Sequence, residues 1–276
     1  MPTPVLTALH CYPVKSMAGC APDEALMEPW GLAGDRRWAV TDADGRVLTQ
    51  RQAPRLALGA AVPLPGGGVR LGAPGARPLE LAPPVSGERG TVTVQVFSEK
   101  VTAVPAGAAA DAWVSAFLGT PSRLVHMADP AHCRPIDPDY AHEGETVSFA
   151  DGYPLLVTTT ASLRALDALV AEGDHAAEGP LPMDRFRPNA VVDGTEPWEE
   201  DGWRRVRIGE VTFRAVKPSG RCIITTTDQR TAERGREPLR TLARHHRLGG
   251  KPVFGQNLIP EHTGTLRVGD PVEVLD

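Results

Sequence analysis

Glycine and proline interrupt this chain at short intervals along its whole length. The 276 residues include 28 glycines and 27 prolines, whereas aromatic residues make up only 5%. Both residues favour turns, glycine because it adopts positive φ and proline because its φ is fixed. Few uninterrupted stretches remain for long helices. The sequence therefore predicts a mainly β fold (α+β) with many short strands, tight turns and a few helices.

Hydrophobic periodicity locates the individual elements. Alternating apolar and polar residues predict strands over 5–12 and 91–97. A hairpin is predicted over 37–49, because an Asp-Gly turn separates two β-rich segments there. Helical spacing of apolar residues predicts helices over 106–118 and 238–246. These elements are short and spread along the chain, as the predicted fold class requires.

The pattern of elements divides the chain into two predicted domains. A polar, proline-rich segment over 128–145 is predicted to be a mobile surface loop, and it lies in the region 119–150 where the pattern changes. We therefore expect two β-barrel-like domains, residues 1–120 and 121–276. The first strand is compatible with packing in the second domain, although it is far from that domain in sequence.

Charge and hydropathy exclude several kinds of partner. The formal net charge is −5, so the chain lacks the basic balance of a nucleic-acid-binding protein. No apolar run reaches the length of a membrane span, and residues 1–9 do not have the pattern of a signal peptide. The four cysteines are too few for a disulfide scaffold and include no CxxC pair. We expect a cytoplasmic protein with reduced thiols and with neither membrane nor nucleic-acid partners.

One cysteine stands in a distinctive setting. Cys222 follows Arg221 in the proline-glycine loop 217–222 and precedes β-branched residues, which predict a strand over 223–227. A thiol in this setting has three possible roles: nucleophile, persulfide carrier or ligand of a soft metal. Each role requires the thiolate, which a neighbouring guanidinium favours. The alternative is a buried cysteine that packs as a small hydrophobic side chain.

Further polar clusters lie at the ends of predicted strands, where ligand sites often form. They combine cations, hydroxyl groups and a helix start. This combination suits an anionic ligand, because arginine binds phosphate in a bidentate manner and lysine supplies a point charge. Taken singly, each cluster is more often a solvated charge or a helix cap. The clusters are Lys15-Ser16, Asp35-Arg36-Arg37, Thr158-Thr159-Thr160 with Ser162, Arg187 with Asn189, and Arg221-Cys222.

The order of these and other motifs resembles one protein family along nearly the whole chain. It is similar to the MOSC-domain proteins with an N-terminal MOSC β-barrel, which include the amidoxime-reducing component and bacterial counterparts that reduce N-hydroxylated compounds. A single motif such as Lys-Ser carries little weight, whereas the set in this order is specific. The matching segments are Tyr12-Pro13-Val14-Lys15-Ser16, Gly34-Asp35-Arg36-Arg37-Trp38, 49–56, Phe186-Arg187-Pro188-Asn189, 221–228, 254–257 and 264–270.

The resemblance implies a molybdenum cofactor, a pterin dithiolene with a phosphate tail that holds an oxo-molybdenum centre. The family's cysteine ligand matches Cys222, which is therefore the expected metal ligand and catalytic residue; a thiolate is a soft ligand that suits such a site. We expect the cofactor in the cleft between the two domains. The expected cofactor-binding residues are Lys15, Ser16, Arg36, Arg187, Asn189 and Arg221, with a looser match for the hydroxyls of Thr160 and Ser162.

The activity that the resemblance implies is reduction of N-hydroxylated or N-oxygenated small molecules. No cysteine spacing predicts an iron–sulfur cluster, so electrons are expected from a separate flavin or iron–sulfur protein. Ser219-Gly220 stands where relatives often carry Cys-Ser, and we expect one side-chain hydrogen bond to the cofactor to be lost there. A second implied function is that of a cofactor carrier or persulfide relay, because the family takes its name from a cofactor sulfurase. A third is a thiol enzyme that uses Cys222 without a metal.

Overall fold

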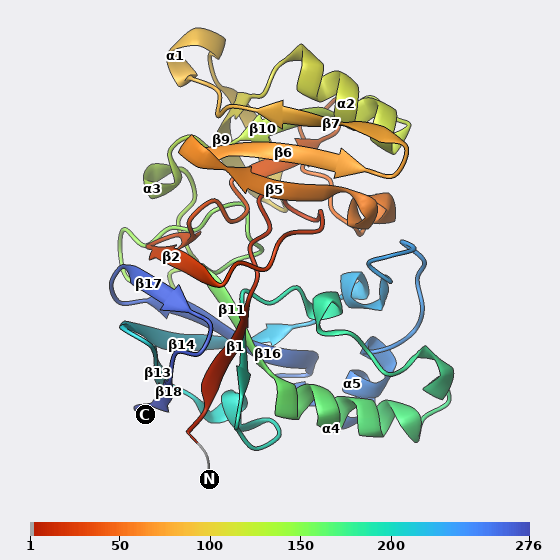
Figure 1. Cartoon of the computed structure of the whole chain (residues 1–276), viewed down its shortest axis with the longest axis vertical. Coiled ribbons are helices and arrows are strands. Elements are labelled where there is room, and N and C mark those ends of the chain that lie inside the picture. Colours follow the sequence, from red (N-terminus) through yellow and green to blue (C-terminus); the bar gives the residue numbers. More distant parts are fainter. Residues whose placement is uncertain (1–2) are drawn as a thin grey trace.

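The computed structural model describes residues 3–276, which form two lobes stacked along the long axis of the molecule (Figure 1). Strands from the first half of the chain build most of the upper lobe, and strands from the second half build most of the lower lobe. The structure is mainly β, with five α-helices in the described residues. The predicted fold class is therefore confirmed.

An eight-stranded sheet curls into a nearly closed barrel in the lower lobe. A hydrogen bond from Leu6 N to Asp270 O, at 2.9 Å, and one from Val272 N to Pro4 O, at 2.7 Å, bring its two edges together. The strands follow the order β1 (Val5–Leu9), β12 (Ala190–Asp193), β11 (Leu155–Thr159), β16 (Lys251–Pro260), β14 (Val211–Gly220), β13 (Arg205–Ile208) and β18 (Val272–Val274), and β15 (Arg247–Leu248) pairs with β16.

The first strand belongs to this barrel although the other strands lie far from it in sequence. β1 pairs antiparallel with β12, so that Leu6 lies opposite Val192 and Leu9 lies opposite Ala190. All four side chains are buried in the barrel core. The chain must therefore cross from the lower lobe to the upper lobe directly after β1. This crossing segment carries Lys15 and Ser16.

Two sheets and the long helix α2 (Ala108–Leu118) form most of the upper lobe. Helix α2 buries Val114 and Phe117 in a core that also contains Trp38. The helix ends at Gly119, whose left-handed conformation is typical of a helix C-terminus. One sheet has the order β4 (Trp38–Thr41), β10 (Arg123–His126), β9 (Glu99–Pro105) and β8 (Val92–Val96), and the other has the order β5 (Ala60–Leu64), β6 (Gly68–Ala73) and β7 (Ala76–Leu81).

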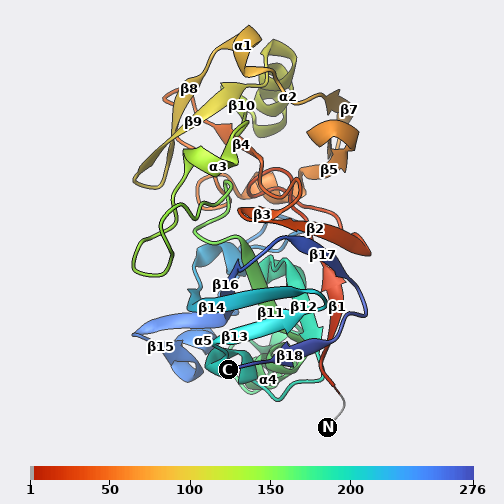
Figure 2. The same ribbon diagram turned by 90° about the vertical axis from the view of Figure 1, so that its left-hand side faces the viewer.

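A small sheet made from both halves of the chain lies where the lobes meet (Figure 2). It contains β3 (Gly31–Leu32), β2 (Glu24–Glu28) and β17 (Gly264–Arg267), and β2 pairs antiparallel with β17. Met27 and Leu266 are buried in the core of the lower barrel. The two lobes share this sheet and this core. The position and orientation of one lobe relative to the other are therefore fixed.

The remaining helices cover the lower barrel or form single turns. Helices α4 (Thr160–Ala171) and α5 (Leu239–His245) pack through Leu166 and Leu242 onto Phe254 of β16. Helices α1 (Ser86–Arg89) and α3 (Pro130–Cys133) have four residues each. Within residues 3–276, no helix combines the length and the apolar character that crossing a membrane requires.

The strand predicted after Cys222 is wrong. Residues Ile223–Thr226 form a 3₁₀ helix instead. The hydroxyl of Thr225 donates to the carbonyl of Cys222, and the hydroxyl of Thr226 donates to that of Ile223, each at 2.9 Å. Threonine side chains can satisfy local backbone groups in this way and so compete with strand pairing. Cys222 therefore lies at a corner between β14 and this helical turn.

The hairpin predicted over 37–49 forms only in part. Its first strand is β4, but this strand pairs with β10 along its length. Beyond the turn no strand is assigned over residues 42–49, but Val47 forms an isolated bridge with Thr41 and Leu48 N donates to Val40 O at 2.8 Å. Strand β10 follows residue 120 in sequence and nevertheless pairs within the upper lobe. The division of the chain into domains at residue 120 stays a prediction.

Candidate functional site

A cleft of about 280 Å³ lies between the two lobes. The crossing segment after β1, the residues before β11, the turn before β12 and the end of β14 contribute its walls. Among the described residues that line it, Asp151 is the only acidic one, so the cleft carries an excess of positive charge. The lining cations are Lys15, Arg36, Arg185, Arg187, Lys217 and Arg221.

Lys15 points into the junction and is held by two oxygen atoms. Its Nζ donates to the carbonyl of Phe149 at 2.7 Å and pairs with Asp151 Oδ1 at 2.5 Å. The side chain is buried, and this burial lowers the pKa of Lys15 to about 8 although Asp151 acts in the opposite direction. The next residue, Ser16, is fixed through its carbonyl, which accepts a hydrogen bond from Gln50 Nε2 at 2.9 Å.

Three residues that line the cleft have left-handed backbone conformations. The φ angles are 69° for Ser16, 49° for Arg36 and 53° for Arg187. A side chain with a Cβ atom adopts this region at an energetic cost of roughly 1–2 kcal/mol. Such strain persists only where the surrounding structure fixes the backbone, and it gathers at functional sites. These three side chains are thus held by their surroundings rather than by local preference.

Two arginines from different parts of the chain flank one tyrosine ring. The guanidinium of Arg36 lies 4.6 Å from the ring centroid of Tyr12, and that of Arg187 lies 4.3 Å from it. Arg36 also pairs with Asp35 Oδ2 at 2.6 Å and donates to Asn189 Oδ1 at 3.0 Å. Burial lowers the pKa of Arg187 to about 10. The cationic wall is therefore held by stacking and by one buried carboxylate.

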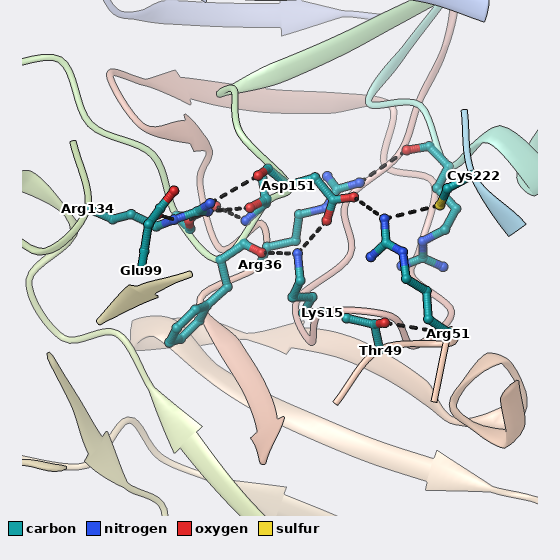
Figure 3. A network of polar contacts seen from close by, with 12 residues as sticks. Lys15, Arg36, Thr49, Arg51, Glu99, Arg134, Asp151 and Cys222 are labelled. Atoms are coloured by element: carbon teal, nitrogen blue, oxygen red, sulfur yellow. Dashed lines mark hydrogen bonds and ion pairs between the residues drawn. The ribbon is translucent and has the colours of Figure 1, made fainter. Parts of the chain in front are cut away.

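Cys222 contacts an arginine other than its sequence neighbour. Arg221 turns away and donates to the carbonyls of Phe254, at 2.9 Å from Nε, and Phe186, at 3.1 Å from Nη1. Burial lowers the pKa of Arg221 to about 10. The Sγ atom of Cys222 instead accepts a hydrogen bond from Arg51 Nη2, at 3.1 Å (Figure 3). The thiol of the lower lobe thus meets a cation of the upper lobe.

Asp151 connects this thiol contact to Lys15 (Figure 3). Its Oδ2 atom lies 3.7 Å from Arg51 Nη2, and its Oδ1 atom pairs with Lys15. Arg134 donates to the backbone carbonyl of Asp151 at 3.0 Å and fixes this segment. Desolvation acts to raise the pKa of Asp151, but the charges of Lys15 and Arg51 outweigh it and hold this pKa well below its usual range. The carboxylate is ionised at neutral pH.

The structure brings most of the sequence-predicted residues to this one cleft. Thr160 and Ser162 are exceptions and do not line it. Ser162 is buried and its hydroxyl bonds to Glu200 Oε2 at 2.7 Å, while the hydroxyl of Thr160 bonds to Asp193. Thr159 caps helix α4 by accepting a hydrogen bond from Ser162 N. The hydroxyls of Thr160 and Ser162 are therefore engaged by carboxylates outside the cleft, and their expected contact with a cofactor stays a prediction. The residues that do line the cleft are Lys15, Ser16, Arg36, Arg187, Asn189, Arg221 and Cys222.

Sequence reasoning missed several residues of the site. Arg51 and Asn257 lie in segments that matched the family pattern, so their polar side chains were a usable signal. Asp151 gave no signal, because its contact with Lys15 spans 136 residues. Arg185 and Lys217 line the cleft beside motifs that were recognised.

Two further cysteines close the loop that carries Lys15. Cys11 and Cys20 face each other as an antiparallel pair with reciprocal backbone hydrogen bonds of 2.9 Å. Both are free thiols, and Cys11 is buried. Their interaction lowers the pKa of Cys20 to about 7 and raises that of Cys11. The pair fixes the two ends of the crossing segment against each other.

This structure is a two-lobed β-barrel protein whose junction gathers cations around one thiol. The family description "MOSC N-terminal beta barrel domain" matches residues 3–121, and "MOSC domain" matches residues 144–273. The chain therefore belongs to the MOSC-domain family, in the group that carries an N-terminal MOSC β-barrel.

Curated relatives fall into two groups by name. Mitochondrial amidoxime-reducing component 1 of Homo sapiens is 33% identical over 285 residues, which cover 97% of this chain and 82% of that protein. Mitochondrial amidoxime reducing component 2 of Rattus norvegicus is 32% identical over 280 residues, covering 95% and 80%. Molybdenum cofactor sulfurase of Danio rerio is 31% identical over 261 residues, which cover 91% of this chain but 31% of that protein.

Proposed function

We propose that this protein is a molybdenum-cofactor-dependent reductase of N-hydroxylated or N-oxygenated small molecules. A separate flavin or iron–sulfur protein supplies its electrons. The observation that carries the proposal is the convergence of Cys222 and six cofactor-binding candidates on one cleft. Similarity to amidoxime-reducing components over 97% of the chain supports the reductive chemistry.

The donor set of the cleft suits a cofactor with an anionic tail. Cations outnumber carboxylates along its walls. The Nε atom of Arg185 is buried and has no hydrogen-bond partner within residues 3–276. A buried donor without a partner costs about 1–3 kcal/mol. A phosphate would supply the missing acceptor and the missing negative charge, because its oxygens accept several charge-assisted hydrogen bonds.

Each cleft residue has a role that its chemistry supports. Cys222 is the candidate protein ligand of molybdenum, since a thiolate is a soft donor, and Arg51 fixes its Sγ atom from the opposite lobe. The cofactor, when bound, supplies the two-electron redox chemistry. The overall reaction is R–NHOH + 2 H⁺ + 2 e⁻ → R–NH₂ + H₂O, with the electrons delivered by the partner. Cofactor binding falls to Lys15, Ser16, Arg36, Arg187, Asn189 and Arg221.

The test begins with protein purified from a host that makes the cofactor. We expect stoichiometric molybdenum and fluorescent pterin, and turnover of an aromatic amidoxime with a reduced dye. Cys222→Ser replaces a soft ligand by a poor one and should abolish turnover while the fold is kept. Cys133→Ser is the matched control, because Cys133 does not line the cleft. Full turnover in Cys222→Ser would refute the metal-ligand assignment.

The sulfurase relatives favour a second candidate function. Their similarity covers 91% of this chain, although the chain spans only about a third of their length. In this alternative the protein carries the cofactor or relays sulfur as a persulfide on Cys222. Cofactor that exchanges readily, with no dye-driven turnover, would favour the carrier. An additional sulfur atom on Cys222 in the mass spectrum would favour the relay.

A further inference from the structure

A second cavity opens beside Cys222, on the side of the upper lobe. Its volume is about 350 Å³, and it lies between the turn 49–52 and the tip of the β8–β9 hairpin. Lys15 lines both this cavity and the interlobe cleft. Arg51 lines the second cavity, and its Nη2 atom donates to Cys222 Sγ. Arg51 thus connects the wall of the second cavity with the thiol.

The walls of this cavity are cationic. Lys15, Arg46 and Arg51 line it, and no carboxylate from residues 3–276 does so. The single charge of Asp151 is shared between Lys15 and Arg51. Arg46 has only an exposed partner, Asp44, at 3.9 Å, and such surface pairs contribute little. The cavity therefore attracts a negatively charged group. The uncharged lining residues are Val47, Thr49, Gln52, Gln95, Val96 and Phe97.

Phe97 occupies a strained and half-exposed position at the edge of this cavity. Val96 pairs with Glu99, so Phe97 and Ser98 form a two-residue hairpin turn. The φ angle of Phe97 is 54°, a conformation for which such turns prefer glycine, asparagine or aspartate. The side chain is also 48% exposed. The strained backbone and the exposed aromatic ring of Phe97 both reduce the stability of the folded protein.

The ring of Phe97 lies against the cations of the cavity. Its centroid is 5.4 Å from Lys15 Nζ and 5.2 Å from Arg51 Cζ. A planar molecule that packs on the exposed part of the ring therefore lies between these cations, on the side of Cys222, and Arg46, which also lines the cavity. Aromatic pairs of this kind favour offset or edge-on packing and contribute beyond the apolar area that they bury.

We propose that this second cavity is a substrate-specificity pocket for planar, aromatic N-hydroxylated compounds that carry a carboxylate or phosphate. Phe97 forms the aromatic wall, and Arg46 at the rim binds the anion. The N-hydroxyl group then points toward the cleft that holds Cys222. This inference rests on the proposed reductase function and names its substrate class.

The test compares three substrates on the cofactor-loaded protein with a reduced dye. They are 4-carboxybenzamidoxime, benzamidoxime and the aliphatic acetamidoxime. We expect KM to be lowest for the carboxylate and highest for the aliphatic compound. In Phe97→Gly the ratio of KM for acetamidoxime to KM for benzamidoxime should fall about fivefold, as the loss of an aromatic contact implies. Phe97→Tyr should restore the ratio.

The variants separate recognition from folding. Phe97→Gly relieves a left-handed residue but also loses the contacts of the ring with Lys15 and Arg51, so its unfolding midpoint should stay close to that of the unmodified protein. Arg46→Gln should raise KM for the carboxylate relative to benzamidoxime by about threefold, in the range of an exposed ion pair. Val62→Ala removes an exposed apolar side chain elsewhere in the upper lobe and is the control. An unchanged KM ratio in Phe97→Gly would overturn the proposal.

A binding measurement keeps this proposal distinct from the proposed reaction. 4-Carbamoylbenzoate is planar and anionic but cannot be reduced, and its affinity can be measured by titration calorimetry. We expect its Kd to rise about fivefold in Phe97→Gly. If none of the three amidoximes is reduced, the reductase function fails, while this titration still decides on the pocket. An unchanged Kd for 4-carbamoylbenzoate in both Phe97→Gly and Arg46→Gln would refute the assignment of this cavity as a binding pocket.

Discussion

Arg51 Nη2 lies 3.1 Å from Cys222 Sγ, although 171 residues separate the two in sequence. Arg51 lies in the connection after β4 of the upper lobe, and Cys222 lies just after β14 of the lower barrel. The same guanidinium nitrogen lies 3.7 Å from Asp151 Oδ2. The thiol is therefore positioned by a contact that exists only when the two lobes are assembled (Figure 3).

This contact predicts a selective effect of Arg51→Lys. A lysine retains the charge, but its flexible ammonium group lacks the rigid planar guanidinium that places Nη2 between the sulfur and the carboxylate. We expect dye-driven turnover to fall about tenfold, as the loss of one charge-assisted hydrogen bond implies. The unfolding midpoint should barely change, because the side chain is partly exposed. Arg55→Lys, in the same segment but outside both cavities, should behave as the unmodified protein. Equal turnover in Arg51→Lys would argue against a positioning role.

The burial of Lys15 predicts a pH dependence of stability. Burial lowers the pKa of Lys15 from 10.5 to about 8, despite Asp151. Between these two values the unfolded chain keeps a proton that the folded protein has released. The free energy of unfolding should therefore rise as pH increases from about 8 to 10.5, by an amount on the order of 3 kcal/mol.

Denaturant unfolding of Lys15→Met across the same pH range isolates this contribution. The difference between the unmodified protein and the variant removes the titration of all other groups. Lys100→Met, at an exposed position, should retain the pH dependence of the unmodified protein. A Lys15→Met curve parallel to that of the unmodified protein would show that Lys15 keeps its proton in the folded state.

Substitution of Gly255 by alanine should cause a steric clash that substitution of most other glycines would not cause. Its φ angle is 77°, and a Cβ atom there would collide with the backbone carbonyl of Val157. Gly250 has a similar φ of 76° but open space around it. We expect Gly255→Ala to lower the free energy of unfolding by about 3 kcal/mol or more and Gly250→Ala by about 1 kcal/mol. Chemical denaturation of both variants gives the comparison, and equal losses would mean that β16 can shift away from β11.

The paired cysteines predict selective alkylation. The interaction with Cys11 lowers the pKa of Cys20 to about 7, whereas burial raises the pKa of Cys133. At pH 7.5 we expect iodoacetamide to modify Cys20 faster than Cys133. The rate at Cys20 should fall about eightfold between pH 7.5 and pH 6, because the thiolate is the reactive form. Peptide mass spectrometry follows each site. Cys11→Ala should slow Cys20, and an unaffected rate would remove the pair as the cause.

Local sequence patterns predicted much of the fold, for reasons that the structure makes plain. The helical spacing of Trp113, Phe117 and Leu118 predicted the helix that the structure shows as α2, and Gly119 ends it. The strand predicted after Cys222 did not form, because Thr225 and Thr226 bond to the carbonyls preceding them. Threonine has a high strand propensity, but its hydroxyl can also stabilise a helical turn. The run of β-branched residues after Cys222 therefore could not distinguish a strand from a turn.

The composition of the candidate site could be predicted from local sequence motifs, whereas its contacts could not. The sequence by itself determined the residue types: Cys222 as the distinctive thiol, and the cations and amide of the recognised motifs. It also led to Thr160 and Ser162, whose hydroxyls bond to Asp193 and Glu200 outside the cleft. Only the tertiary structure decided that Arg51 rather than Arg221 contacts the thiol, and that Asp151 joins it to Lys15. The physical reason is distance along the chain: Arg51 and Cys222 are 171 residues apart and Lys15 and Asp151 are 136 apart, so these contacts form only when the two lobes pack together.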